Sequence, residues 1–87
     1  MTIEVLNDTT NYYPNLDNTY RFVEMRCGKH SATVCKVTGS RPHVQVCVHN
    51  ASNRAWRGLG KSFATAEEAK ARYKTAEIRA MIEHATA

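Results

Sequence analysis

No acidic residue lies between Met25 and Ala66, although the chain contains eight Asp and Glu residues. The same segment carries seven Lys and Arg residues, so the net charge of +4 is concentrated there. The N-terminus lacks a basic run followed by an apolar stretch, and no apolar run reaches the length of a membrane span. These absences predict a cytoplasmic protein with no secretory signal, no membrane contact and a basic surface for an acidic partner.

Cysteine is also scarce, and its three copies are an odd number for a disulfide framework. Reduced thiols are therefore expected. Cys27, His30 and Cys35, followed by His43, Cys47 and His49, could be drawn as a zinc site. However, Cys47 and His49 alternate along an expected strand, and Cys35 falls in the middle of another. Structural zinc usually uses ligands paired two to four residues apart within each half, so we expect no metal and no cofactor.

The sequence also lacks the usual groupings of catalytic residues. A Cys–His nucleophile would need a third group to orient it, and the acid-free segment has no carboxylate for that role. Residues 58–62 (Gly-Leu-Gly-Lys-Ser) lack the earlier glycine of a phosphate-binding loop and are interpreted as a bend in a strand. The chain is therefore expected to be a non-catalytic binding protein.

With 87 residues, the chain has room for a single domain over residues 1–87. Residues 1–19 are expected to form a loop-rich N-terminal arm, in which a short strand could form at residues 3–6 before a loop at residues 7–19 that is rich in Asn, Asp and Thr. Residues 20–63 have the composition of a sheet, and Val44, Val46 and Val48 alternate with polar residues in its clearest strand. The expected strands cover residues 20–26, 31–37 and 43–49, with a fourth run at 56–63 that bends at Gly58 or Gly60.

A helix is expected over residues 65–85. Thr65 can cap its first turn, and Glu68 stands three residues later, as in a capping box. The stripe that begins at Ala69 would pack on the sheet, which leaves Ile78 and Ile82 for solvent or for a homodimer surface. The predicted fold is thus α+β, an antiparallel sheet of three to four strands with one long C-terminal helix packed on one face.

The acid-free segment supplies the candidate binding surface. Clustered Lys and Arg neutralise phosphates, and a flat side chain among them adds stacking. The alternative is a basic face that only aids solubility. The predicted contact residues for nucleic acid or another partner are Arg26, Lys29, Lys36, Arg41, Arg54, Trp56, Arg57 and Lys61.

Two parts of the sequence resemble the AP2-type DNA-binding domains. The downstream part is Trp56-x-Gly58 followed by Phe63-x-Thr65-Ala66-Glu67-Glu68-Ala69, and the upstream part covers residues 20–34. That family lays a three-stranded sheet in the DNA major groove with a helix behind it. The resemblance implies that the DNA-facing residues are Arg21, Arg26, Lys29, Lys36, Trp56 and Arg57. An extra strand expected within residues 38–55 departs from the family pattern.

A second class of function stays open. Small sheet-plus-helix modules without motifs are similar to the anti-CRISPR and host-takeover proteins of phages, which block a host nucleoprotein by direct contact. The expected function is therefore nucleic-acid or nucleoprotein binding by a protein of a phage or mobile element. The alternative is inhibition of a host protein complex, for which the basic face would meet an acidic patch. In either case the expected location is the bacterial host cytoplasm.

Overall fold

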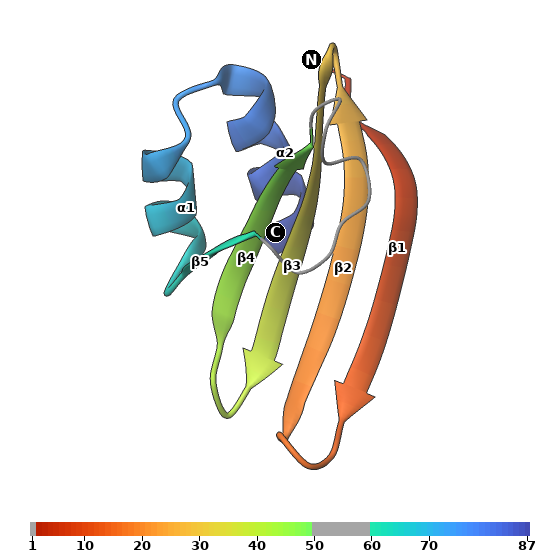
Figure 1. The fold of residues 1–87 in the computed structure, drawn as a ribbon, viewed down its shortest axis with the longest axis vertical. Helices are drawn as coiled ribbons and strands as arrows, with labels where there is room; N and C mark the ends of the chain where they lie inside the picture. Colours follow the sequence, from red (N-terminus) through yellow and green to blue (C-terminus); the bar gives the residue numbers. More distant parts are fainter. Residues whose placement is uncertain (1, 50–59) are drawn as a thin grey trace.

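The computed structural model describes residues 2–49 and 60–87 of the chain. They form five strands followed by two helices (Figure 1). The strands are β1 (Glu4–Tyr13), β2 (Asn18–Cys27), β3 (His30–Gly39), β4 (His43–His49) and β5 (Lys61–Phe63), and the helices are α1 (Ala66–Arg72) and α2 (Ala76–Thr86). Neither helix is long and apolar enough to cross a membrane, and no other described segment is helical.

The strands form one antiparallel sheet in the order β1-β2-β3-β4-β5, so each strand pairs with its neighbour in sequence. The three central strands confirm the expected ones at 20–26, 31–37 and 43–49, each a little longer in the structure where it differs. Gly28 turns the chain between β2 and β3 with φ of +61°, a conformation that glycine adopts without steric cost. The fold class is therefore α+β with an antiparallel sheet, as predicted.

The expected loop-rich arm at residues 1–19 is wrong, because most of it is strand β1. Its ladder with β2 runs from Glu4 opposite Arg26 to Tyr13 opposite Asn18, with one irregularity between Val5 and Asn7. Every residue of β1 is exposed, so the strand buries no hydrophobic face of its own. Backbone pairing and side-chain contacts to β2 stabilise a sequence whose polar composition predicted a loop.

Strand β5 covers the end of the fourth expected run, so it is β1 that brings the sheet to five strands where three or four were expected. Phe63 lies opposite Val44, and Lys61 lies opposite Val46. A side chain on Gly60 would place its Cβ 2.7 Å from the carbonyl oxygen of Val46, so only glycine fits there. The rest of the expected run at 56–63, including Gly58, lies outside the described residues.

Helix α1 begins as the capping box predicts. The Glu68 backbone N–H donates to Thr65 Oγ1 at 3.2 Å, and the Glu68 carboxylate accepts from the backbone N–H of Ala64 at 3.1 Å.

The prediction of a single long helix is wrong, because Tyr73 adopts an extended conformation and ends α1. Residue 76 then starts α2, and Lys70 on α1 bonds Glu83 on α2 with 2.6 Å between Nζ and Oε2.

Both helices pack on the same side of the sheet, where they cover the core (Figure 1). Val23, Met25, Val34 and Val46 come from the sheet. The helices contribute the buried residues Ala69, Ile78, Met81, Ile82 and Ala85.

The predicted dimer surface at Ile78 and Ile82 is therefore wrong. Ile82 is 0% exposed and Ile78 is 6% exposed, both against the sheet. The physical reason is the break after Tyr73, which restarts the helical phase. A stripe that would face away from the sheet in one continuous helix faces toward it in α2.

Candidate functional site

The sheet has a second face, which the two helices do not cover. We call it the outer face. It carries the residues that alternate with the core positions, such as Tyr20 and Phe22 on β2 and His43 and Gln45 on β4. Val44, Val46 and Val48 turn to the helices, so the alternation predicted for β4 is confirmed.

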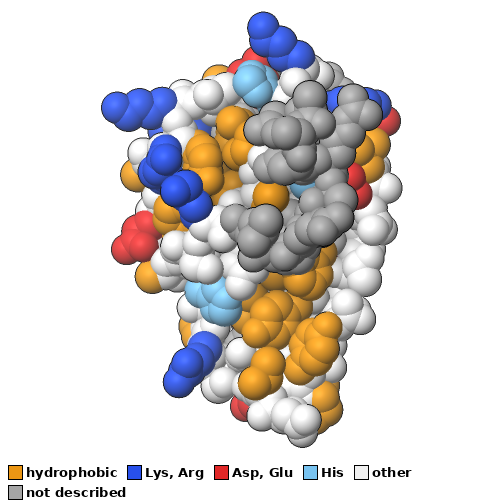
Figure 2. All heavy atoms as spheres, in the orientation of Figure 1, with side chains coloured by type: hydrophobic (Ala, Val, Ile, Leu, Met, Phe, Trp, Pro, Cys, Tyr) orange, Lys and Arg blue, Asp and Glu red, His pale blue; other side chains and the backbone are white. Residues whose placement is uncertain are grey.

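Within residues 2–49 and 60–87, the predicted basic residues do not converge on this face. Arg26 lies on the outer face and binds the Glu4 carboxylate of β1, with 2.8 Å between Nη2 and Oε1. Lys29 is exposed in the turn between β2 and β3. Arg41 is exposed in the turn between β3 and β4, at the other end of the sheet. Figure 2 accordingly shows Lys and Arg side chains spaced around the rim of this view.

Two more predicted residues belong to the helix side. Lys36 follows Val34 by two positions on β3, and its ammonium donates to the Thr86 carbonyl of α2 at 3.2 Å. Lys61 pairs with Val46 and is exposed at the β5 edge. Arg21, which the AP2 resemblance includes, also lies on this side and binds Asp8. Arg54, Trp56 and Arg57 lie outside the described residues.

The outer face instead gathers aromatic rings around Tyr20. The Tyr13 ring meets the Tyr20 ring edge-on with centroids 5.2 Å apart, and the Phe22 ring stacks with it at 6.3 Å. The His43 ring lies edge-on at 6.5 Å. We call Tyr13, Tyr20, Phe22 and His43 the aromatic group. Figure 2 shows hydrophobic side chains gathered on the lower half of this face.

Strand register explains why these rings meet. Tyr20, Val37 and His43 lie directly opposite one another on β2, β3 and β4. Val37 is fully buried although it faces away from the helices, because the Tyr20 and His43 rings flank it. The rings thus form a small second apolar layer with one side of Tyr13 still open to solvent.

Two hydrogen bonds orient the His43 ring. Its Nδ1 lies 2.8 Å from the Arg41 carbonyl oxygen, and its Nε2 lies 3.1 Å from Gln45 Nε2. A carbonyl can only accept, so Nδ1 carries the proton and Nε2 accepts from the Gln45 amide. This neutral tautomer satisfies both bonds and holds the ring beside Tyr20.

The adjoining turns are tied together by Asn18, which is 5% exposed. Its Oδ1 accepts from the backbone N–H of Arg41 at 3.1 Å and from Ser40 Oγ at 3.3 Å. The Ser40 backbone N–H donates to the Asp17 carbonyl at 3.1 Å. These bonds join the β1–β2 turn to the β3–β4 turn and position the backbone that carries Arg41.

A broad hollow of about 730 Å³ lies between these turns. Its lining includes Tyr20, Arg41 and His43, together with the exposed side chain of Leu16. The Arg41 cation, the rings of Tyr20 and His43 and several amide and hydroxyl groups therefore surround one concave surface. Such a surface fits a flat, anionic ligand segment, since rings stack on bases and an arginine binds phosphate.

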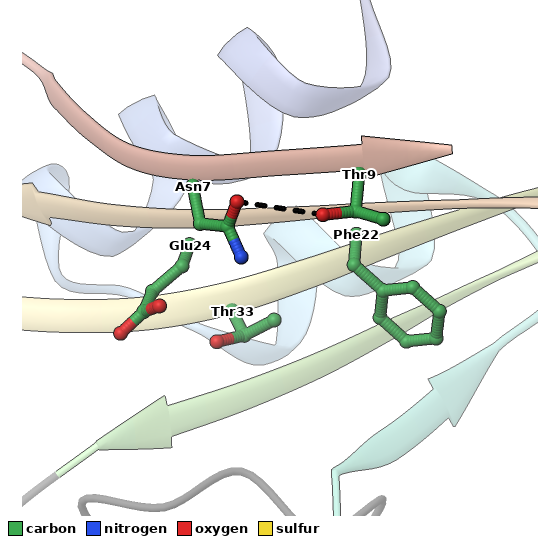
Figure 3. Close-up of a pocket in the computed structure, with 5 residues that line it drawn as sticks. All are labelled: Asn7, Thr9, Phe22, Glu24 and Thr33. Carbon is green, nitrogen blue, oxygen red and sulfur yellow. Dashed lines mark hydrogen bonds between the residues drawn. The ribbon is translucent and has the colours of Figure 1, made fainter. Parts of the chain in front are cut away.

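A smaller hollow of about 300 Å³ lies on the outer face beside β1 (Figure 3). It is lined by the Phe22 ring, the Glu24 carboxylate and the hydroxyl of Thr33. Asn7 and Thr9 close it from β1, where the Thr9 hydroxyl donates to Asn7 Oδ1 at 3.4 Å. The negative charge of Glu24 disfavours phosphate here, so the two hollows differ in the ligands they suit.

The three cysteines are divided between the two faces of the sheet. Cys27 belongs to the helix-side core, whereas Cys35 and Cys47 lie on the outer face, and all three are buried. Burial raises the pKa of the Cys35 thiol to about 11, so it stays protonated at neutral pH. Within residues 2–49 and 60–87, no three His, Cys, Asp or Glu side chains are grouped to hold a metal ion.

Tyr13, Tyr20 and Phe22 were absent from the predicted site, although the sequence held a signal for two of them. Tyr20 and Phe22 share parity in the first expected strand, so they had to share a face. Tyr13 cannot be placed from the sequence, because the composition of its segment predicts a loop. Comparisons with known proteins add no assignment, since no protein-family model, no curated protein and no solved structure matches this chain.

Proposed function

We propose that this protein binds nucleic acid through the aromatic group and Arg41, and that its ligand is single-stranded. The observation that carries the proposal is the Tyr20 ring, which contacts three other rings on the face away from the helices, next to Arg41. Single strands offer unstacked bases, and proteins bind them by stacking those bases on aromatic side chains of a sheet. The overall charge of +4 favours approach of a polyanion.

The scatter of the cations that the structure describes favours a single strand over a duplex. A duplex lying on the outer face would need several cations aligned along its phosphates. Among the described cations of the outer face, Arg26 is bound to Glu4 and Arg41 stands at the far end. Stacking therefore supplies most of the affinity in this proposal, and Arg41 supplies one phosphate contact.

The test is binding of a fluorescent single-stranded oligonucleotide, measured by anisotropy over a range of salt concentrations. Tyr20→Leu removes the central ring and keeps an apolar cover over Val37. It should weaken binding by roughly tenfold, since one stacked base is worth about 1–3 kcal/mol. Circular dichroism of the variant verifies that the sheet is retained.

Arg41→Ala should weaken binding and reduce the slope of log K against log salt by about 0.7, the value for one phosphate on a single strand. Lys29→Ala is the matched control, because Lys29 is exposed in the turn at the opposite end of the sheet. It should leave the affinity for a short oligonucleotide nearly unchanged.

Absence of oligonucleotide binding by the wild-type protein would contradict the proposal. Capture of an acidic host protein that depends on Tyr20 and Arg41 would then identify the same surface as a protein-binding site. That result would favour the inhibitor function, in which the target is a host complex.

A further inference from the structure

Strand β1 forms an unusually open edge of the sheet. It is ten residues long, it is the terminal strand, and all of its residues are exposed. The opposite edge is β5, which is only three residues long. The exposed large hydrophobic residues of the described chain lie on β1 or in the turn that follows it, and they are Val5, Leu6, Tyr12, Tyr13 and Leu16.

An edge strand presents unpaired backbone N–H and C=O groups, which another strand can bind. Proteins usually block such an edge with Pro, with Lys or with outward charges. β1 contains neither Pro nor Lys, and each of its two acids is bound inward by an arginine of β2. Asp8 binds Arg21 and Glu4 binds Arg26, each with a shortest N–O distance of 2.8 Å. The charges that would repel a second strand are thus neutralised within the chain.

The geometry points to a second copy of this chain as the partner. We propose that β1 pairs antiparallel with β1 of that copy about a twofold axis, which joins two sheets edge to edge. This inference does not depend on the proposed nucleic-acid binding, because it uses only the free edge of β1.

The sequence of β1 selects the register of this pairing. Residues directly opposite in an antiparallel ladder share a face, whereas successive residues of one strand lie on opposite faces. The twofold axis must therefore pass between the two copies of one residue, which pairs with itself. An axis at Asp8 would set two carboxylates against each other, whereas an axis at Thr9 sets Asp8 opposite Thr10 of the second copy. An axis at Thr10 would leave Val5 and Leu6 without a partner strand. Thr9 is therefore the central residue.

The register at Thr9 also matches the ends of the strand. The irregularity between Val5 and Asn7 changes the parity there, so Val5 lies on the same face as Tyr12. With Thr9 at the axis and Leu6 as the extra residue of the bulge, Val5 lies opposite Tyr12 of the second copy. Exposed apolar groups at one end of β1 thereby meet exposed apolar groups at the other end, twice over. The small hollow that Thr9 lines would also lie on both sides of the axis.

The first test is the mass in solution together with a cross-link at the axis. Sedimentation equilibrium of the wild-type chain should give twice the mass of 9.8 kDa. Thr9→Cys should form an intermolecular disulfide under a mild copper oxidant, because opposed residues of a ladder bring their Cα atoms to about 4.5–5.5 Å. Thr38→Cys, exposed on β3, is the matched control and should stay uncoupled. The three native thiols are buried and should not interfere.

The second test breaks the pairing without touching the core. Thr9→Lys places two ammonium groups opposite one another and should convert the dimer to monomer, while Thr38→Lys should leave it dimeric. A wild-type chain that stays monomeric at its highest attainable concentration would overturn the inference. So would a dimer that Thr9→Lys does not dissociate, since its interface would then lie elsewhere. Oligonucleotide binding by Thr9→Lys is measured separately. The mass in solution then tests the β1 pairing, and the oligonucleotide affinity tests the proposed function.

Discussion

Arg21 on β2 binds Asp8 on β1 through two parallel hydrogen bonds, from Nε to Oδ1 at 3.0 Å and from Nη2 to Oδ2 at 2.8 Å. The two residues are not directly opposite in the ladder, because Asp8 faces Val23 and Thr10 faces Arg21. The contact therefore crosses the ladder diagonally and fixes the edge strand against the sheet. Bidentate geometry makes it stronger than a single exposed ion pair.

This contact predicts a pH dependence of stability. The hydrogen bond from Arg21 holds the pKa of Asp8 below its ordinary value of 3.8. A carboxyl whose pKa is lower in the folded state stabilises the protein above its unfolded pKa, and that contribution disappears as the pH falls through the folded value. Asp8→Asn should therefore lower the melting temperature at neutral pH and make little difference well below pH 4.

Thermal unfolding from pH 7 to pH 2 measures the effect, and Arg21→Ala closes a double-mutant cycle with Asp8→Asn. The two changes together should cost less than the sum of each alone, because they remove the same contact. Additive costs at neutral pH would mean that the two side chains do not interact in solution.

Thr65→Ala should lower the free energy of unfolding by about 1 kcal/mol, since the side chain caps α1 through its bond to the Glu68 N–H. Urea unfolding followed by circular dichroism measures the loss. Thr75→Ala is the matched control, because Thr75 precedes α2 without any side-chain cap bond. Equal costs for the two variants would argue against the cap at Thr65.

Ile82→Ala should cost about 2–5 kcal/mol, because it opens a cavity at a site that is 0% exposed. Leu16→Ala removes a comparable aliphatic group at a site 54% exposed and should change the stability by at most about 0.5 kcal/mol. Chemical unfolding of both variants compares the two sites. A small loss of stability in Ile82→Ala would contradict the burial of Ile82.

Gly39→Ala should destabilise the joined turns below the aromatic group. Gly39 has φ of +127°, and an added Cβ would lie 2.3 Å from the Asp17 carbonyl oxygen. Gly28→Ala is the control, since its φ is +61° and its nearest neighbours are 3.9 Å from the added Cβ. The control should cost about 1–2 kcal/mol for the left-handed backbone alone, and Gly39→Ala should cost more. Similar melting temperatures for both variants would contradict the close approach at Gly39.

The central strands and the start of α1 could be predicted because local chemistry determines them. Gly28 allows the turn, alternating valines mark β4, and Thr65 with Glu68 satisfies the first N–H groups of α1. Most of β1, beyond residue 6, could not be predicted, since its residues bury no apolar face and its conformation depends on β2. The end of α1 at Tyr73 also lacks a local signal, because no Gly or Pro follows it.

The candidate site could be predicted only in part. A run of bases in the sequence does not make a basic face, because a strand sends successive residues to opposite sides. Arg26 and Lys36 therefore lie on different faces despite belonging to the same acid-free segment. The aromatic group combines β1, β2 and β4, so it required the pairing of strands that are separate in the sequence.

The order of the elements has a consequence for how the chain folds during synthesis. Each strand pairs with the one made just before it, and the loops that join β1 to β4 are short, so this part of the sheet can grow hairpin by hairpin. The cover is made afterwards, because Ile78, Met81 and Ile82 belong to α2, which follows all five strands. Until α2 leaves the ribosome, Met25, Val34 and Val46 form a bare apolar sheet face that invites aggregation. Slowing translation between β5 and α2 should therefore lower the yield of folded protein, whereas a chaperone that shields this face should restore it.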